Sequence, residues 1–293
     1  MTAKARANRK TEPFPAAPVA KWYGGGYERG PWTVSYFVRH TSYYEPFVGP
    51  ASILGFKPKV EFETVTDTNG RLVNLLTVIR DRVDELVTLL NLTPWAEGEW
   101  EKAQVQADDP LEDARRFWFA CWSSIRGGPP DPKNMFAWNV GPESRYSSPA
   151  GTAKRHDLLR WARRLENVQI LWRSAFDVLP SFLSSAGTLI YADPPYVLET
   201  RSRKNGYHAH EFTKENHRKL ADLLRAAAGC VIISGYQSDL YAELYEAHGW
   251  ERHDKEFSAN NGATRVESIW LNPLLQRRRA VQTLPLFMVP TVP

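Results

Sequence analysis

The chain has 293 residues, of which 43% are hydrophobic, 24% charged and 12% aromatic. This apolar content fills a sizeable core and excludes a mainly disordered chain, and the length suits one large α/β domain or one domain with an inserted module. No apolar run reaches the roughly 18 residues of a membrane helix, and no apolar stretch follows the basic N-terminus as in a secretory signal. We therefore expect a cytoplasmic protein with no membrane partner.

Charge is unevenly distributed, although the formal net charge is only +4. Residues 95–113 hold seven acidic residues and one lysine, whereas residues 151–173 and residues 201–219 each hold six basic and two acidic residues. The run Arg277-Arg278-Arg279 is basic as well. A solvated helix face explains any one such stretch, but two basic stretches beside sequence motifs favour a surface that faces phosphate groups.

The N-terminal third predicts a tail followed by strands and a helix. Residues 1–20 are rich in Pro, Ala and Lys and are expected to be a mobile tail. The apolar run at 43–54, broken by Pro and Gly, predicts a strand that ends in a turn, and alternation at 60–67 predicts a second strand. Apolar residues at helical spacing predict a helix over 72–92. Residues 93–146 lack this alternation of strands and helices, apart from a helical stretch at 110–122. The change indicates an insertion.

After the insertion, strands and helices alternate again. Helices are predicted at 156–165, 215–228 and 238–248, and strands at 168–171, 188–192 and 231–234. Asn261-Gly262, between extended runs over 256–271, predicts a terminal antiparallel hairpin. Alternating strands and helices favour a mostly parallel sheet, with ligand sites at the carboxyl ends of its strands.

The motif Asp193-Pro194-Pro195-Tyr196 directly follows the apolar strand at 188–192. Two prolines fix φ and remove two N–H donors, so the chain leaves the strand in an extended shape with its carbonyls available. An acidic acceptor followed by a carbonyl can hold a planar amino group from two sides, and the aromatic residue can stack on the ring that carries it. Because Pro-Pro is also a common way to end a strand, the motif needs its context.

That context comes from residues 43–69. Gly49 allows close backbone approach at a strand end, and Asp67 lies 18 residues further on, at the end of the next strand. An acidic residue about 20 residues beyond a strand–glycine turn holds a ribose hydroxyl in nucleoside-binding sheets. The sequence lacks a glycine-rich dinucleotide fingerprint and a Walker-type motif, which leaves a nucleoside cofactor without phosphates.

These motifs, in this order, resemble the Dam-like S-adenosylmethionine-dependent DNA adenine-N6 methyltransferases, including phage and prophage members. The resemblance runs from about Lys21 to Pro273. The family's motifs are matched by Lys21-Trp22-Tyr23-Gly24-Gly25-Gly26, Glu45-Pro46-Phe47-Val48-Gly49, Asp67-Thr68-Asn69, Asp193-Pro194-Pro195-Tyr196, Ile233-Ser234-Gly235-Tyr236 and Glu267-Ser268-Ile269-Trp270-Leu271-Asn272-Pro273.

The resemblance implies S-adenosyl-L-methionine as the cofactor. The residues that it assigns to cofactor binding are Trp22, Tyr23, Gly24, Gly25, Glu45, Pro46, Phe47, Gly49, Asp67, Asn69, Ser174 and Ala175. Three positions depart from the family. Gly26 stands where lysine is usual, Ala51 replaces a second glycine, and Ser174 stands where many members carry an aspartate that touches the cofactor's adenine. The catalytic motif is intact.

The resemblance and the chemistry together imply methyl transfer to the exocyclic N6 of an adenine flipped out of duplex DNA. Asp193, Pro194, Pro195 and Tyr196 are the expected catalytic residues. The Asp193 side chain and the Pro194 carbonyl would accept hydrogen bonds from the amino group, and Tyr196 would stack on the base. No metal is expected, because His208, His210 and His217 lack a ligand pattern.

The insertion at 93–150 stands where the family carries its target-recognition region. Ser124 and Arg126 are candidates for DNA contact, with Trp118 and Trp122, although core packing explains the tryptophans as well. Further candidates after the catalytic motif are Arg201, Arg203, Lys204 and Tyr207. The acidic stretch at 95–113 is expected to face away from DNA.

We therefore expect an α/β protein with a Rossmann-like methyltransferase sheet, helices on both faces, a C-terminal antiparallel hairpin and a smaller, mainly helical inserted module. The expected domains are a tail (1–20), a catalytic domain (21–92 and 151–275), the target-recognition module (93–150) and a second tail (276–293). Double-stranded DNA is the expected partner of a monomer or weak dimer. Whether a cognate restriction endonuclease is a further partner stays open.

Two alternatives also stay open: an RNA adenine-N6 methyltransferase and a catalytically silent DNA-binding homologue. Cytosine-N4 enzymes are less favoured, because they usually carry serine where this chain has Asp193.

Overall fold

The computed structural model describes residues 18–22, 26–131, 133–138, 148–197, 212–258 and 264–283. The described residues form two compact units. The sheet unit contains those of Pro31–Val48, Lys59–Thr68 and Asn167–Pro293, and the helical unit contains those of Met1–Gly30, Gly49–Pro58 and Asn69–Glu166. The two units are defined by packing and not by function, so the domain boundaries expected from the sequence stay a prediction.

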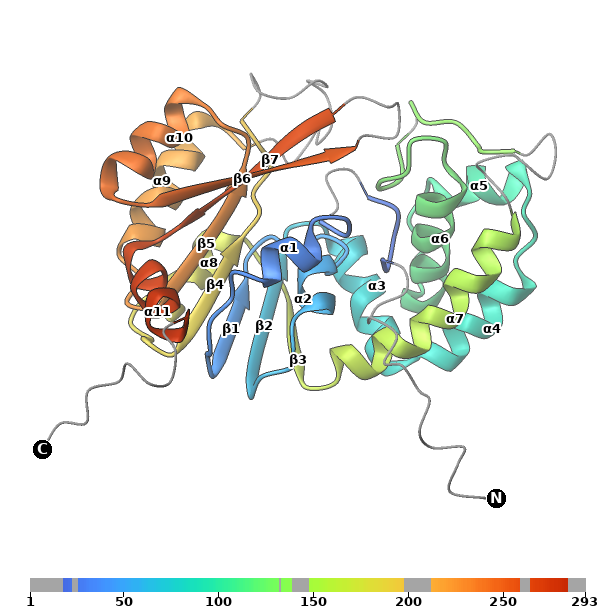
Figure 1. Ribbon diagram of the computed structural model, residues 1–293. Helices are drawn as coiled ribbons and strands as arrows, with labels where there is room; N and C mark the ends of the chain where they lie inside the picture. Colours follow the sequence, from blue (N-terminus) through green and yellow to red (C-terminus); the bar gives the residue numbers. More distant parts are fainter. Residues whose placement is uncertain are drawn as a thin grey trace, which may run out of the picture. The chain divides into compact units, whose positions relative to one another are not determined.

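A seven-stranded sheet forms the centre of the sheet unit, in the order β3-β2-β1-β4-β5-β7-β6 (Figure 1). The strands are β1 (Ser42–Glu45), β2 (Phe62–Asp67), β3 (Val168–Trp172), β4 (Thr188–Ala192), β5 (Cys230–Gly235), β6 (Glu251–Ser258) and β7 (Thr264–Leu271). The first five strands are parallel, and β7 runs antiparallel to both β5 and β6. The chain moves outward from β1 to β3 and returns to β4 on the other side of β1. The topological switch point, where such sheets bind ligands, therefore lies between β1 and β4.

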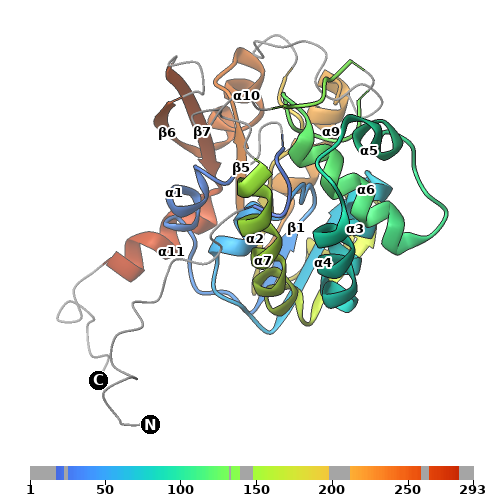
Figure 2. The same cartoon turned by 90° about the vertical axis from the view of Figure 1, so that its right-hand side faces the viewer.

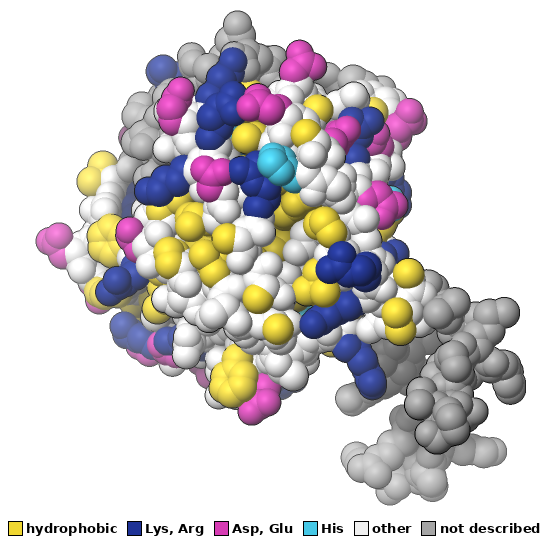
Figure 3. All heavy atoms as spheres, turned by 90° about the vertical axis from the view of Figure 1, so that its left-hand side faces the viewer, with side chains coloured by type: hydrophobic (Ala, Val, Ile, Leu, Met, Phe, Trp, Pro, Cys, Tyr) yellow, Lys and Arg dark blue, Asp and Glu magenta, His cyan; other side chains and the backbone are white. Residues whose placement is uncertain are grey.

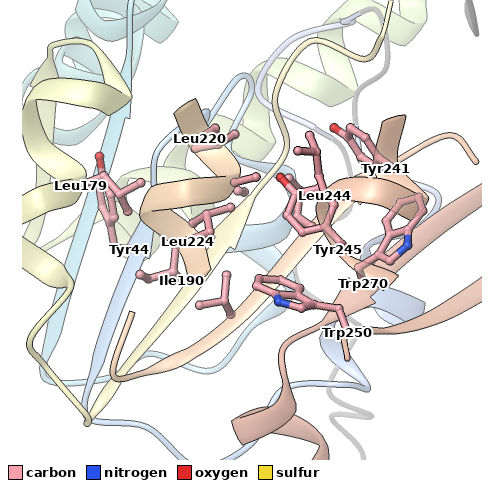
Figure 4. Close-up of a cluster of buried hydrophobic side chains, with 14 of the residues drawn as sticks. Tyr44, Leu179, Ile190, Leu220, Leu224, Tyr241, Leu244, Tyr245, Trp250 and Trp270 are labelled. Atoms are coloured by element: carbon pink, nitrogen blue, oxygen red, sulfur yellow. The ribbon is translucent and has the colours of Figure 1, made fainter. Parts of the chain in front are cut away.

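The main core of the sheet unit lies between the sheet and the helices α9 (Lys214–Arg225) and α10 (Asp239–Leu244). Thr213 and Ser238 cap these helices by accepting hydrogen bonds from Asn216 N and Tyr241 N. Figure 4 shows side chains from both helices directed towards strand residues. The buried side chains that it labels are Tyr44, Leu179, Ile190, Leu220, Leu224, Tyr241, Leu244, Tyr245, Trp250 and Trp270. This packing holds β1, β4 and β5 rigidly beneath the loops that follow them.

Three further helices belong wholly or, for α1, mostly to the sheet unit: α1 (Gly30–Val34), α8 (Ala175–Val178) and α11 (Pro273–Thr283). Figure 3 views the face that carries α9, α10 and α11, on which Lys and Arg are intermixed with Asp and Glu. Within the basic run, Arg278 donates to the carbonyl of Ala186, and Arg279 donates to the carbonyl of Ser35 and lies over the Tyr36 ring. These two arginines therefore make contacts within the fold.

The helical unit is built from α2 (Ser52–Phe56), α3 (Gly70–Asp81), α4 (Val83–Leu92), α5 (Glu97–Ala103), α6 (Pro110–Ser123) and α7 (Ser148–Leu165). α6 contacts α3, α4 and α5, and α7 contacts α3 and α4 (Figure 2). α6 begins at Asp109, whose carboxylate accepts from Glu112 N, with Pro110 at the first helical position. Both features are typical of helix starts.

Acidic residues of the 95–113 stretch pair with arginines of the same unit. Asp113 binds Arg71 at 2.8 Å, and Glu112 binds both Arg115 and Arg116. The arginines hold the pKa of Glu112 down to about 2 through hydrogen bonds, that of Arg115 first. Glu112 and Asp113, two of the seven acidic residues in this stretch, are thus paired with arginines of the same unit.

Several predicted boundaries were wrong. The single helix expected over 72–92 is two helices, because Arg82 leaves helical backbone geometry (φ −140°, ψ 34°), although hydrogen bonds from Arg82 N to Val78 O and from Leu86 N to Arg82 O continue across it. The run at 43–54 does contain a strand that ends in a turn, β1 to Glu45, but the helix α2 that follows the turn was not predicted. Helices α5 and α11 were not predicted, and α11 occupies part of the expected tail from residue 276. None of the described helices is long and apolar enough to span a bilayer.

Candidate active site

The carboxyl ends of the five parallel strands lie along one edge of the sheet unit. Glu45 and Asp67 end β1 and β2, and Ser174 follows β3. Asp193 follows β4, and Ser234 lies near the end of β5. The fold therefore brings to one edge the residues that were singled out separately in the sequence, and Asp193 stands beside the switch point.

Asp193 is held by a buried hydroxyl of the neighbouring strand. Ser234, which is 1% exposed, donates to Asp193 Oδ1 at 2.6 Å. The hydroxyl of Tyr191 in turn donates to Ser234 Oγ at 3.1 Å. A serine hydroxyl carries one hydrogen, so accepting from Tyr191 leaves that hydrogen for the short bond to Asp193. This chain orients a partly exposed carboxylate at the edge of the sheet.

Tyr196 is held at its hydroxyl end by the buried carboxylate of Glu267. It donates to Glu267 Oε2 at 3.0 Å, and Tyr236 donates to Glu267 Oε1 at 3.3 Å. The two tyrosine rings lie edge to face, 4.8 Å apart and 79° to one another. Arg265 forms an ion pair with the same carboxylate. Tyr196 is thus one member of an aromatic pair with a shared anchor.

The end of β1 is connected to β2 through Thr66. The Thr66 hydroxyl donates to the carbonyl of Pro46 at 3.0 Å, and the backbone carbonyl of Thr66 accepts from Val48 N. Burial raises the pKa of Tyr44, whose hydroxyl is hydrogen-bonded with that of Thr66. Glu45 is 1% exposed and accepts from the hydroxyl of Tyr43 at 2.8 Å. These contacts set the path of the Glu45-Pro46-Phe47 segment.

Three phenylalanines surround the turn after β1. Phe47 contacts Phe212 edge to face at 5.5 Å, and Phe176 stacks parallel to Phe212 at 5.8 Å. Phe212 also meets the ring of His217 at 4.8 Å. His217 is fully buried and its Nδ1 is hydrogen-bonded with the hydroxyl of Tyr241. Phe47 therefore borders a partly buried aromatic group, and His217 has a packing role.

The ends of β2 and β3 carry two further sequence-predicted residues. Asp67 is partly exposed and pairs in register with Trp172, which is 70% exposed and donates through its indole to the carbonyl of Thr68. Ser174 caps α8 by accepting from Phe176 N, and Ala175 is buried. Aspartate is an equally good cap, so Ser174 preserves the local turn while removing a charge. The chemistry of this group, a carboxylate that can accept hydrogen bonds near aromatic rings, would fit a nucleoside.

Trp22, Gly49 and Asn69 lie in the helical unit. A Cβ at Gly49, which has φ +50°, would lie 3.7 Å from the indole nitrogen of Trp22, so these two predicted residues come together. Asn69 caps α3 by accepting from Leu72 N. Ala51, at the family's glycine position, adopts φ 57°, a conformation that costs a residue with a Cβ roughly 1–2 kcal/mol.

The predicted DNA-contact residues of the insertion lie in a short antiparallel pairing. Ser124 bridges to Phe136, and Ile125 N donates to the carbonyl of Met135. Ser124 is 2% exposed and accepts from the indole of Trp100 at 2.8 Å, so its side chain supports this loop instead of facing solvent. Arg126 is exposed, as a DNA contact requires.

Lys21 connects the N-terminal element with this loop inside the helical unit. Its ammonium donates to the carbonyls of Ser124 and Ile125, and its own carbonyl accepts from Gly128 N. Burial lowers the pKa of Lys21. Trp118 is fully buried, and Trp122 is partly buried and donates to the carbonyl of Val19. Packing therefore explains both tryptophans.

The remaining predicted residues lie outside the described part of the chain. They are Tyr23, Gly24, Gly25, Arg201, Arg203, Lys204, Tyr207, His208 and His210. Within the described residues, no group of three or more His, Cys, Asp or Glu side chains could hold a metal ion. Cys121 and Cys230 are buried free thiols.

Sequence reasoning assigned no role to Ser234, Tyr236 or Glu267. All three lie in motifs that resemble the family, yet only the pairing of β5 with β4 and β7 brings them to Asp193 and Tyr196. A polar residue inside an apolar strand, as in the run from Val231 to Ser234, is the signal that could have indicated Ser234.

Comparison with protein families gives one match. The model of the D12 class N6 adenine-specific DNA methyltransferase family matches residues 22–258, which is most of the chain. Comparison with curated proteins finds no matching relative.

Proposed function

Because the chain belongs to the D12 class of N6 adenine-specific DNA methyltransferases, we propose that the carboxyl edge of its sheet unit is the active site. There the enzyme would methylate the exocyclic N6 of an adenine flipped out of duplex DNA at a specific sequence. The observation that carries this proposal is the position of Asp193-Pro194-Pro195-Tyr196, which leaves β4 beside the switch point, with Asp193 hydrogen-bonded to Ser234 of β5 and Tyr196 to Glu267 of β7.

The residues at this edge suit S-adenosylmethionine, which supplies an electrophilic methyl group when bound. Asp67 would accept hydrogen bonds from the ribose hydroxyls, as acidic residues at the end of the second strand do in nucleoside-binding sheets. Ser174 and Ala175 would line the adenine. Glu45, Pro46 and Phe47 are the other proposed cofactor residues of the sheet unit. For Gly49, Asn69 and the segment from Trp22 to Gly25, which belong to the helical unit, the proposal rests on the sequence motifs alone.

Asp193 and the Pro194 carbonyl would accept hydrogen bonds from the amino group of the target adenine. The lone pair of the amino nitrogen is delocalised into the adenine ring. Two hydrogen-bond acceptors favour a pyramidal nitrogen, whose lone pair can attack a methyl group. The bond from Ser234 keeps the Asp193 carboxylate in one orientation, so less ordering is required during the reaction. Tyr196 would stack on the base.

DNA recognition is proposed for the inserted segment at 93–150 and for residues after the catalytic motif. Arg126 is the described candidate, because it is an exposed cation on a loop held by Lys21. Arg201, Arg203, Lys204 and Tyr207 would contact phosphate groups. A cytoplasmic location follows from a DNA substrate.

Methyl transfer from labelled S-adenosylmethionine to mixed unmethylated duplex DNA, with RNA of matched composition as the alternative, tests this function. The proposal expects label in N6-methyladenine of DNA. Label only in RNA would favour the RNA enzyme, and DNA binding without any label would indicate a silent homologue.

A further inference from the structure

We propose that Glu267, on β7, is a positioning residue that holds Tyr196 and Tyr236 together as an aromatic receptor for the target base. The inference deepens the proposed function and rests on it, because it assumes that Tyr196 stacks on the adenine. It adds two residues, Glu267 and Tyr236, to the machinery of the site.

The geometry of the cluster is that of one acceptor shared by two rings. Glu267 is 2% exposed, and its two oxygens each accept from one tyrosine hydroxyl, at 3.0 Å from Tyr196 and 3.3 Å from Tyr236. Arg265 lies 3.2 Å from Oε1. Because each ring is held at its hydroxyl end, the edge-to-face arrangement at 4.8 Å follows from the shared carboxylate.

A buried carboxylate is costly unless it is paired and hydrogen-bonded. An ionised carboxylate only accepts, so both phenols must donate to it and both hydroxyls must point to the same side chain. Glutamine, which has the same shape, would present N–H groups to one of the two hydroxyls, which would then have to accept, and neither hydrogen bond would be charge-assisted. The charge of Glu267 therefore makes both phenols donors and strengthens both hydrogen bonds.

The sheet places these residues together by register. Gly235 of β5 pairs with Ser268 of β7, and the strands are antiparallel, so Tyr236 continues opposite Glu267. A Cβ at Gly235 would lie 2.4 Å from the ring of Tyr241, which shows how closely the chain passes the core at this turn. Tyr196 arrives from β4, on the other side of β5. Three strands thus supply one aromatic receptor.

This arrangement predicts an effect on turnover more than on cofactor binding. A tyrosine ring without its anchor must be ordered each time a base enters, and that ordering costs free energy. Asp67 and Ser174, which we assign to the cofactor, do not contact Glu267 in any described hydrogen bond. A purely structural role would instead lower stability and would not depend on the Tyr196 hydroxyl.

A double-mutant cycle tests the inference. Glu267→Gln, Tyr196→Phe and the double variant are compared for kcat and for the KM of S-adenosylmethionine with mixed unmethylated duplex DNA, and for thermal stability. We expect each single variant to lower kcat by about tenfold, in line with a hydrogen bond to a charged group, and the double variant to be no slower than Tyr196→Phe. The KM should change less than about twofold. Glu256→Gln, an exposed glutamate on β6, is the matched control and should match the wild type.

Multiplicative losses in the double variant, or an unchanged kcat in Glu267→Gln, would overturn the positioning role. If Glu267→Gln does not fold, the cycle of Tyr196→Phe with Tyr236→Phe answers the same question. The two hydroxyls share one carboxylate, so we expect their effects to be coupled, and independent effects would overturn the inference. The Asp193→Ala variant separates the two proposals. Full activity of this variant would contradict the proposed active site. If the variant is inactive but the effects of the two tyrosine substitutions are independent, only the role of Glu267 is contradicted.

Discussion

The two units hold the carboxylates described above with different donors. At the edge of the sheet unit, hydroxyl groups of tyrosine and serine donate to Glu45, Asp193 and Glu267, and Arg265 also pairs with Glu267. In the helical unit, Glu112 and Asp113 bind arginines. A hydroxyl donor fixes the direction of a carboxylate without bringing a positive charge, whereas an arginine also neutralises it. We therefore expect loss of a hydroxyl donor to disturb the orientation of its carboxylate, and loss of an arginine-paired acid to lower stability.

Some of the basic residues counted in the sequence also have contacts within the fold. Arg218, in the basic stretch at 201–219, pairs with Glu243, and Lys219 lies 4.6 Å from the centre of the Phe176 ring. The described end of that stretch thus makes contacts within the fold. Charge counted along the chain does not by itself identify a phosphate-facing surface, because some of the cations contact residues of distant segments.

The largest effect outside the proposed catalytic motif should come from Ser234. Ser234→Ala removes the hydroxyl that orients Asp193, and we expect kcat to fall by about tenfold to a hundredfold. Steady-state kinetics with labelled S-adenosylmethionine would measure it. Ser234→Thr keeps a hydroxyl and should retain more activity than the alanine variant. Equal activity of Ser234→Ala and wild type would show that the carboxylate needs no such orientation.

A smaller effect, of a different kind, is expected in the helical unit. Arg126→Ala should raise the KM for DNA several-fold, leave kcat nearly unchanged and reduce the slope of log affinity against log salt by about 1, because one phosphate contact is lost. Binding titrations at several salt concentrations would measure it. Arg39→Ala, an exposed arginine before β1, is the control. A fall in kcat with unaltered DNA affinity would contradict the division between the units.

The smallest effect concerns the arginine-paired acids. The pKa of Glu112 is lowered to about 2, so its pairing stabilises the fold above its ordinary pKa near 4.5, and this stabilisation is lost as the pH falls towards 2. Glu112→Gln should lower the melting temperature at pH 7 by a few degrees at most, and the difference should shrink between pH 5 and pH 3. Thermal denaturation would measure both, with exposed Glu101→Gln as control. A difference at pH 3 as large as the difference at pH 7 would exclude a charge-based origin.

Local patterns predicted the elements that carry the motif. β4 covers residues 188–192 as expected, because a short apolar run that is followed closely by two prolines favours a strand, and Asp193 follows it directly. The bend at Arg82 had no Gly or Pro to indicate it. The burial of Ser124 depends on Trp100, 24 residues away, and the convergence of Tyr196 and Tyr236 on Glu267 depends on strand order. Contacts between distant segments are what single-sequence patterns do not contain.

The most direct test of the active site compares wild type with Asp193→Ala. Both are incubated with S-adenosylmethionine and unmethylated duplex DNA, the DNA is digested, and methylated nucleosides are quantified while DNA binding is measured in parallel. The account predicts N6-methyladenine with the wild type, and none with Asp193→Ala at nearly unchanged DNA affinity. N6-methyladenine formed equally by both proteins, or a methyl group found on cytosine instead, would contradict it.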